Sequence, residues 1–153
     1  MNKAWGIEDN ASAAVDDGLC FGDIDGDGRL DIIGYTGNID HQRRLKVYRN
    51  DLAAGNWVRV RPVGAAGNRG AAGAKIRLFD PGDPAKLLWY EQVQIVGSQS
   101  AHSYYFYGRT ERHFGLGERK KVDVVVEFYP SGKKIERRGV AAGATVEVPE
   151  DGP

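Results

Sequence analysis

The chain has 153 residues, which suits one ordinary domain, or one domain with part of a neighbour. Its 21 basic and 21 acidic side chains give a formal net charge of zero, so the composition indicates no basic face for a nucleic-acid backbone. Hydrophobic residues make up 41% of the sequence, which is enough for a packed core, and no apolar run is long enough to span a membrane.

The first predicted element is a β-hairpin with an aspartate-rich loop. Short apolar runs at 19–21 and 32–35 are typical of strands rather than helices. They enclose the sequence Asp23-Ile24-Asp25-Gly26-Asp27-Gly28-Arg29-Leu30-Asp31. We expect the apolar Ile24 and Leu30 to point inward and to anchor the loop to the core.

Carboxylates occupy positions 1, 3, 5 and 9 of this loop, as Asp23, Asp25, Asp27 and Asp31. Such like charges repel one another unless a cation lies among them. Ca²⁺ takes about six to eight oxygen ligands, and the Arg29 carbonyl at position 7 adds one. Position 12 is Gly34 rather than the glutamate of a helix–loop–helix calcium hand. The sequence therefore predicts a Ca²⁺ site within a β-hairpin; the alternative is a solvated acidic turn.

From Trp57 onward, short strands alternate with turns. Period-2 alternation or apolar runs predict strands at 57–63, 74–79, 86–96, 122–129, 134–137 and 145–148. The mostly apolar strand 122–129 is expected in the middle of a sheet. Turns are predicted at 81–84 and at 130–133, where Gly132 supplies a positive φ, and 149–153 is expected to be a polar tail. At least seven short strands favour an all-β sandwich or barrel.

Aromatic residues gather in two places in the second half of the chain. Exposed Tyr and Trp rings offer flat apolar surfaces with polar edges, which suit the apolar faces of sugars. The candidate ligand-binding residues are Trp89, Tyr90, Tyr105, Tyr107 and Arg109. The alternative interpretation is that these rings are core and edge packing.

Motifs spread over nearly the whole chain resemble two families that occur together. The string 21–33, followed by 47–50, resembles an FG-GAP (VCBS-type) repeat, a blade of β-propellers. The segments 56–60, 67–76, 113–117 and 126–132 resemble the ASPIC/UnbV domain. The resemblance implies a single propeller-blade-like calcium hairpin at 1–50 and a β-sandwich or barrel-like module at 51–153. By similarity, Asp23, Asp25, Asp27, Asp31 and the Arg29 carbonyl hold Ca²⁺.

These observations favour a non-catalytic, calcium-stabilised module of a secreted protein that binds carbohydrate. The polar start of the chain lacks the apolar stretch of a signal peptide. We expect the chain to be part of a longer multidomain protein located outside the cell, in the periplasm or on the cell surface. A structural or protein-interaction module that caps a β-propeller is one alternative. A fragment of a polysaccharide-active enzyme is another, although no paired carboxylates outside the loop indicate catalysis.

Overall fold

The computed structural model describes residues 15–37, 44–53, 55–94 and 111–152. These residues form ten β-strands, and none of them lies in a helix. The described residues before position 54 belong to one compact unit, and the others belong to a second. The predicted all-β fold is confirmed.

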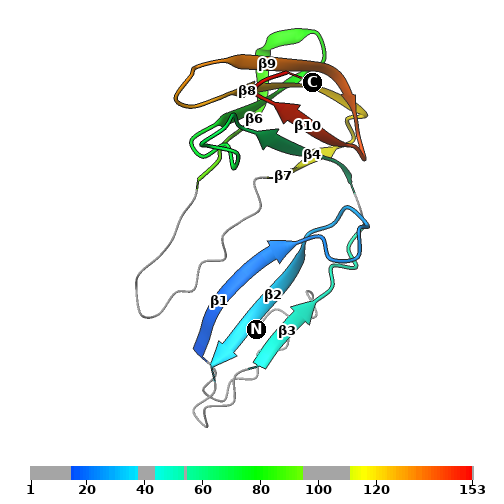
Figure 1. Cartoon of the computed structure of the whole chain (residues 1–153). Helices are drawn as coiled ribbons and strands as arrows, with labels where there is room; N and C mark the ends of the chain where they lie inside the picture. Colours follow the sequence, from blue (N-terminus) through cyan, green and yellow to red (C-terminus); the bar gives the residue numbers. More distant parts are fainter. Residues whose placement is uncertain (1–14, 38–43, 54, 95–110, 153) are drawn as a thin grey trace. The chain divides into compact units, whose positions relative to one another are not determined.

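The first unit is a three-stranded antiparallel sheet in the order β1-β2-β3 (Figure 1). Its strands are β1 (Val15–Gly22), β2 (Asp31–Gly37) and β3 (Arg44–Tyr48). The aspartate-rich loop joins β1 to β2, as predicted, and the last pair of that hairpin is Gly22 with Asp31. The sheet therefore presents the loop at one end of its first two strands.

The prediction that the apolar side chains of this loop point inward is wrong. Ile24 is 53% exposed and Leu30 is 38% exposed. The loop does not need an apolar anchor, because hydrogen bonds from backbone N–H groups to aspartate side chains hold its backbone. The apolar side chains are consequently left at the surface.

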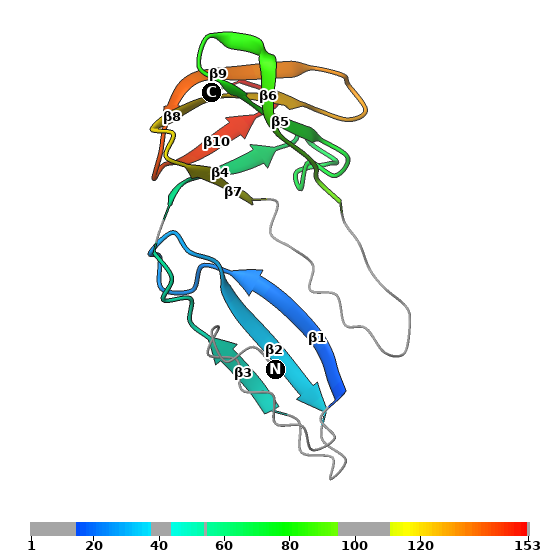
Figure 2. The same ribbon diagram turned by 180° about the vertical axis from the view of Figure 1, so that it is seen from behind.

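The second unit is a sandwich of two sheets (Figure 2). Its strands are β4 (Asn56–Val63), β5 (Lys75–Asp80), β6 (Asp83–Gln92), β7 (Arg112–Gly117), β8 (Lys121–Glu127), β9 (Lys134–Ala141) and β10 (Thr145–Pro149). One sheet has the order β10-β4-β7 and the other β6-β5-β8-β9. The pair β10–β4 is parallel and the remaining pairs are antiparallel. As predicted, β8 is an inner strand, and 130–133 joins it to β9.

Both sheets contribute to one apolar core. Alternate residues of β4, β5, β7, β8 and β10 point inward, as expected for strands that are covered on one face. The fully or almost fully buried members are Val58, Val60, Ala71, Ala74, Ile76, Leu78, Val93, Phe114, Leu116, Val122, Val124, Val126, Phe128 and Val148. Burying these side chains removes their apolar surface from water and is the main favourable term in the folding of the unit.

The segment that follows β10, for which the sequence predicts a polar tail, contains a buried side chain. Glu150 is only 6% exposed. Its carboxylate accepts hydrogen bonds from the Ser131 hydroxyl at 2.6 Å and from the backbone N–H of Ala65 at 2.8 Å. These bonds, first that of Ser131, lower the pKa of Glu150. The glutamate thus ties the chain end to the β8–β9 turn and to the loop after β4.

A second buried carboxylate, Asp123, binds the β5–β6 turn and strand β9 on the outer side of the four-stranded sheet. It accepts hydrogen bonds from the backbone N–H of Gly82 at 2.9 Å and from that of Gly139 at 2.7 Å. These two bonds lower the pKa of Asp123, the Gly82 bond having the larger effect. Asp123 therefore fixes the β5–β6 turn against an irregularity in the β8–β9 ladder.

The loop between β4 and β5 is organised around one asparagine. The Asn68 amide donates hydrogen bonds to the carbonyls of Ala72 and Tyr129, each at 3.0 Å, and accepts one from the N–H of Ala72 at 2.9 Å. The carbonyl of Asn68 passes so close to Gly64 that any Cβ there would collide with it. Close packing of two backbone segments thus requires glycine at position 64.

We predict that Gly64→Ala destabilises the second unit by about 1 to 3 kcal/mol, the usual cost of overpacking. The added Cβ would meet the Asn68 carbonyl and would lie 3.3 Å from the Cα of Ala71, and both obstacles are backbone. The free energy of unfolding in denaturant measures the effect. Gly115→Ala is the control, because a Cβ at this position in β7 has nothing within 4 Å. Equal stability of the two variants would contradict the prediction.

Candidate metal centre

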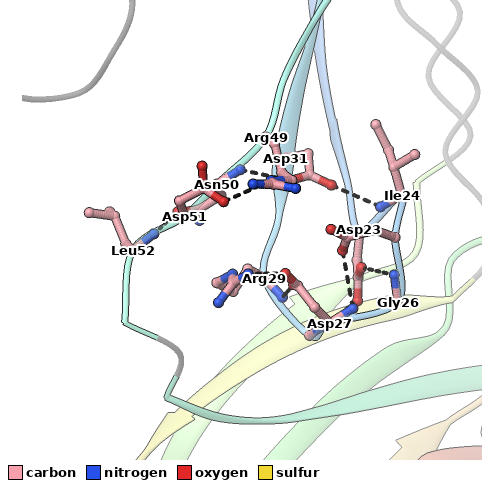
Figure 3. A network of polar contacts seen from close by, with 12 residues as sticks. Asp23, Ile24, Gly26, Asp27, Arg29, Asp31, Arg49, Asn50, Asp51 and Leu52 are labelled. Carbon is pink, nitrogen blue, oxygen red and sulfur yellow. Dashed lines mark hydrogen bonds and ion pairs between the residues drawn. The ribbon is translucent and has the colours of Figure 1, made fainter.

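Asp31, at the start of β2, fastens the aspartate-rich loop to the chain that follows β3 (Figure 3). It is 1% exposed, and its carboxylate accepts hydrogen bonds from the backbone N–H of Asn50 at 2.8 Å and of Ile24 at 3.0 Å. These two bonds, that of Asn50 first, lower the pKa of Asp31. The side chain is therefore ionised at neutral pH and serves as a clamp.

Asn50 completes this clamp from the other side. Its side-chain amide donates to the carbonyl of Leu30 at 3.2 Å, and its amide oxygen accepts the N–H of Leu52 at 3.1 Å. Asn50 is not among the site residues that the sequence predicts. It lies 19 positions from Asp31, so no local spacing connects the two.

Asp23 shapes the tip of the loop. One of its carboxylate oxygens accepts the N–H of Gly26 and the other that of Gly28, both at 2.7 Å. Both glycines have positive φ angles, +80° and +88°, which residues with a Cβ rarely adopt. This backbone curl brings the side chains of Asp23, Asp25 and Asp27 to one side of the loop.

The three clustered carboxylates fit a bound calcium ion. Asp23, Asp25 and Asp27 each offer one oxygen, and these oxygens all lie within 4.8 Å of one another. Oxygens on opposite sides of a bound Ca²⁺ are about 4.6 to 5.2 Å apart, which is twice the usual Ca–O distance. Carboxylate oxygens are also the hard ligands that this ion prefers. The donor set and its spacing therefore agree with the predicted metal.

The same loop contains a cation of its own. The Arg29 guanidinium forms an ion pair with Asp27, whose other oxygen accepts the Arg29 N–H at 2.8 Å. This pair offsets one of the three negative charges. It leaves Asp23 and Asp25 close together with two negative charges, and Asp25 is exposed to solvent. Partial neutralisation by Arg29 is therefore compatible with a divalent ion at this site.

Asp31 stands apart from the other three predicted carboxylate ligands. It is not a member of the carboxylate cluster. Both of its oxygens accept backbone N–H groups, as both oxygens of Asp23 do, and each carboxylate oxygen has more than one lone pair. Direct ligation by Asp31 and by the Arg29 carbonyl stays a prediction. The carboxylates that cluster in the described structure are those of Asp23, Asp25 and Asp27, and their ligation of an ion is a prediction too.

Of the predicted ligand-binding residues, the structure describes Trp89 and Tyr90, and these two do not lie on one face. Trp89 and Tyr90 are about half exposed, but they point to opposite faces of β6, because Trp89 pairs with the buried Leu78 and Tyr90 with Arg77. The Trp89 indole N–H donates to the carbonyl of Gly115 in β7 at 2.9 Å, so it joins the two sheets. Tyr90 lies on the outer face. Tyr105, Tyr107 and Arg109 lie outside the described residues.

We predict that Asp31→Ala destabilises the first unit by about 1 to 3 kcal/mol even in excess chelator, because two partly buried backbone N–H groups lose their buried acceptor. Hydrogen exchange at the amides of Ile24 and Asn50 should accelerate accordingly. Asp51→Ala is the control: this exposed carboxylate pairs with Arg49 at 2.7 Å, and such surface pairs contribute about 0 to 1 kcal/mol. Unchanged exchange in the Asp31 variant would show that the clamp is not needed.

A family model described as ASPIC and UnbV matches residues 64–153, more than half of the chain. No curated protein and no solved structure matches it significantly. The match begins just after β4, which lies inside the β10-β4-β7 sheet, so the folded unit is larger than the matched segment. Domains of this family are usually found in extracellular or cell-surface proteins. Among the described residues, none lies in a helix of the length and apolarity needed to cross a membrane. Because the family model matches more than half of its length, the chain belongs to the ASPIC and UnbV family.

Proposed function

We propose that this chain is a non-catalytic, calcium-stabilised module of an extracellular protein, and that its ligand is a carbohydrate. The observation that carries the proposal is the gathering of three aspartate oxygens within 4.8 Å in the β1–β2 loop. Bringing like charges together is unfavourable, and their attraction to a divalent cation offsets this repulsion. Because the ion binds only the folded loop, it stabilises the folded state.

The role proposed for calcium is structural. The loop connects the two strands whose ladder ends at the Gly22–Asp31 pair, and Asp31 in turn binds the chain after β3. An ion held by the loop would therefore stabilise the whole β1-β2-β3 sheet. The arrangement gives no reason to propose a catalytic role, since all three clustered carboxylates would be ligands of the ion.

The carbohydrate part of the proposal is supported by Tyr90. Its ring is half exposed on the outer face of β6, and the Arg77 guanidinium lies 5.6 Å from the ring centroid. This contact holds the ring in place, and a fixed ring binds with a smaller loss of side-chain entropy. A flat ring beside a cation can pack against the apolar face of a sugar and interact with its hydroxyl groups.

A second candidate function is a protein-interaction module that caps a β-propeller. The β1-β2-β3 sheet has exposed apolar residues on both faces: Phe21 is 65% exposed and Val47 is 56% exposed. Phe21 pairs with Ile32 and Val47 pairs with Ile33, so the two side chains lie on opposite faces. A propeller blade is covered on both faces by its neighbours, which is the arrangement that such a sheet suits.

We predict that calcium raises the melting temperature of the protein and that chelator reverses the effect. At a calcium concentration 100 times the dissociation constant, the expected stabilisation is about 2.7 kcal/mol. Asp25→Asn should abolish the shift with little effect on the calcium-free protein, because Asp25 is exposed and its one loop hydrogen bond, from the Asp27 N–H, is long at 3.3 Å. Asp51→Asn is the control that should keep the shift. The same melting temperature with calcium and with chelator would refute the calcium site.

We also predict that the calcium-loaded protein binds a subset of carbohydrates on a glycan array. Tyr90→Ala should weaken that binding, because it removes the proposed sugar-facing ring. Tyr129→Ala is the matched control, since Tyr129 is an exposed tyrosine in the turn after β8. An array on which no glycan binds would contradict the carbohydrate proposal and favour the propeller-capping function.

A further inference from the structure

A groove lies on the outer face of the β6-β5-β8-β9 sheet, the face turned away from the core. On β5, Ile76 and Leu78 point into the core, so Arg77 between them points outward. On β8, Val124 and Val126 point into the core, so Val125 between them points outward as well. The groove has a volume of about 480 Å³. That size falls within the range of about 300 to 1,000 Å³ that is usual for small-ligand sites.

The floor of the groove is apolar. Phe79 on β5 and Val125 on β8 are half-buried there, and the exposed ring of Pro84 closes one side. Tyr90 stands beside this floor, held by its contact with Arg77. An apolar floor with aromatic rings suits the C–H face of a sugar ring.

The charged groups around the floor leave an excess of positive charge. Glu127 is surrounded by three cations: the Arg77 guanidinium at 3.0 Å, the Lys75 ammonium at 3.7 Å and that of Lys134 at 3.8 Å. These partners, Arg77 first, lower the pKa of Glu127. One carboxylate therefore faces three positive charges, and the Lys134 side chain is 66% exposed.

The carboxylates that line the groove are already satisfied. Asp123 accepts two backbone N–H groups, and Glu136 receives both Nε and Nη2 of Arg138 at 3.0 and 3.1 Å. Both carboxylates therefore have hydrogen-bond donors within the protein and do not require a cationic group from a ligand. The exposed ammonium of Lys134 is the lining group best placed to bind an anion.

We propose that this groove binds an anionic polysaccharide through its uronic acid residues. An apolar sugar face would lie on Phe79 and Val125, and a carboxylate would pair with Lys134 and Arg77. An acidic peptide fits less well, because the apolar floor lies over β5 and β8, whose backbone groups are paired with a neighbouring strand on each side. The inference rests on the proposed carbohydrate-binding function and names its ligand class.

The test is a calorimetric titration of the full chain with a galacturonic acid tetramer at low salt, in chelator so that no metal ion bridges protein and sugar. Lys134→Gln should weaken binding about three- to ten-fold, the effect of losing one charge-assisted contact. The matched control is Lys133→Gln, an exposed lysine one position earlier that is not part of the lining. A neutral galactose tetramer should bind more weakly than the acidic one.

Several results would overturn the proposal. They are no binding of the acidic tetramer, equal binding of the neutral one, equal loss in both lysine variants, or tighter binding of an oligo-aspartate peptide. Binding of other glycans on the array would then leave the carbohydrate function standing without this ligand. The calcium proposal is tested separately, since the melting shift depends on the first unit alone.

Discussion

Backbone N–H groups in turns must find acceptors, and in this protein buried carboxylates supply them. A short-stranded β fold has many turns, and an unpaired buried N–H is costly. The three buried charged side chains of the described structure are Asp31, Asp123 and Glu150. Each accepts two hydrogen bonds, at least one from a backbone N–H, and each has a lowered pKa. The loops of both units are therefore held by ionised acids rather than by apolar anchors.

The cluster of Asp23, Asp25 and Asp27 differs from these buried acids in a way that matters for function. Each buried acid stands alone among donors, whereas the clustered ones face one another across less than 4.8 Å. Within the loop, Asp27 forms an ion pair with Arg29. A divalent cation is the simplest complement to such an arrangement, and Ca²⁺ matches its oxygen ligands and spacing.

The sequence predicted the elements better than the environment of their side chains. Alternation or apolar runs predicted six of the seven strands of the second unit, all but β7, and a local Pro-Ser-Gly signal predicted the β8–β9 turn, because these features depend on near neighbours. Ile24 was wrongly placed inside, because hydrogen bonds to the loop's own aspartates, rather than an apolar anchor, hold the loop. The burial of Glu150 was not predicted, because its partners Ser131 and Ala65 lie far along the chain. The groove could not be predicted either, since its lining comes from β5, β6, β8 and β9 and no short motif unites it.

The motifs that carry the family resemblance have structural roles in this fold. Asn68 organises the loop after β4, Ser131 binds Glu150, and Phe114 and Leu116 fill the core. Membership of the ASPIC and UnbV family thus describes how the module folds, while its activity depends on sites carried by that fold. This is why the ligand is argued from the outer face and the metal from the loop.

The most direct test of the account is a crystal structure of the protein grown with calcium, with anomalous data to identify the ion. The account predicts a calcium peak at about 2.3 to 2.6 Å from oxygens of Asp23, Asp25 and Asp27. Well-ordered aspartates in the same loop, with water alone between their carboxylates at millimolar calcium, would contradict it.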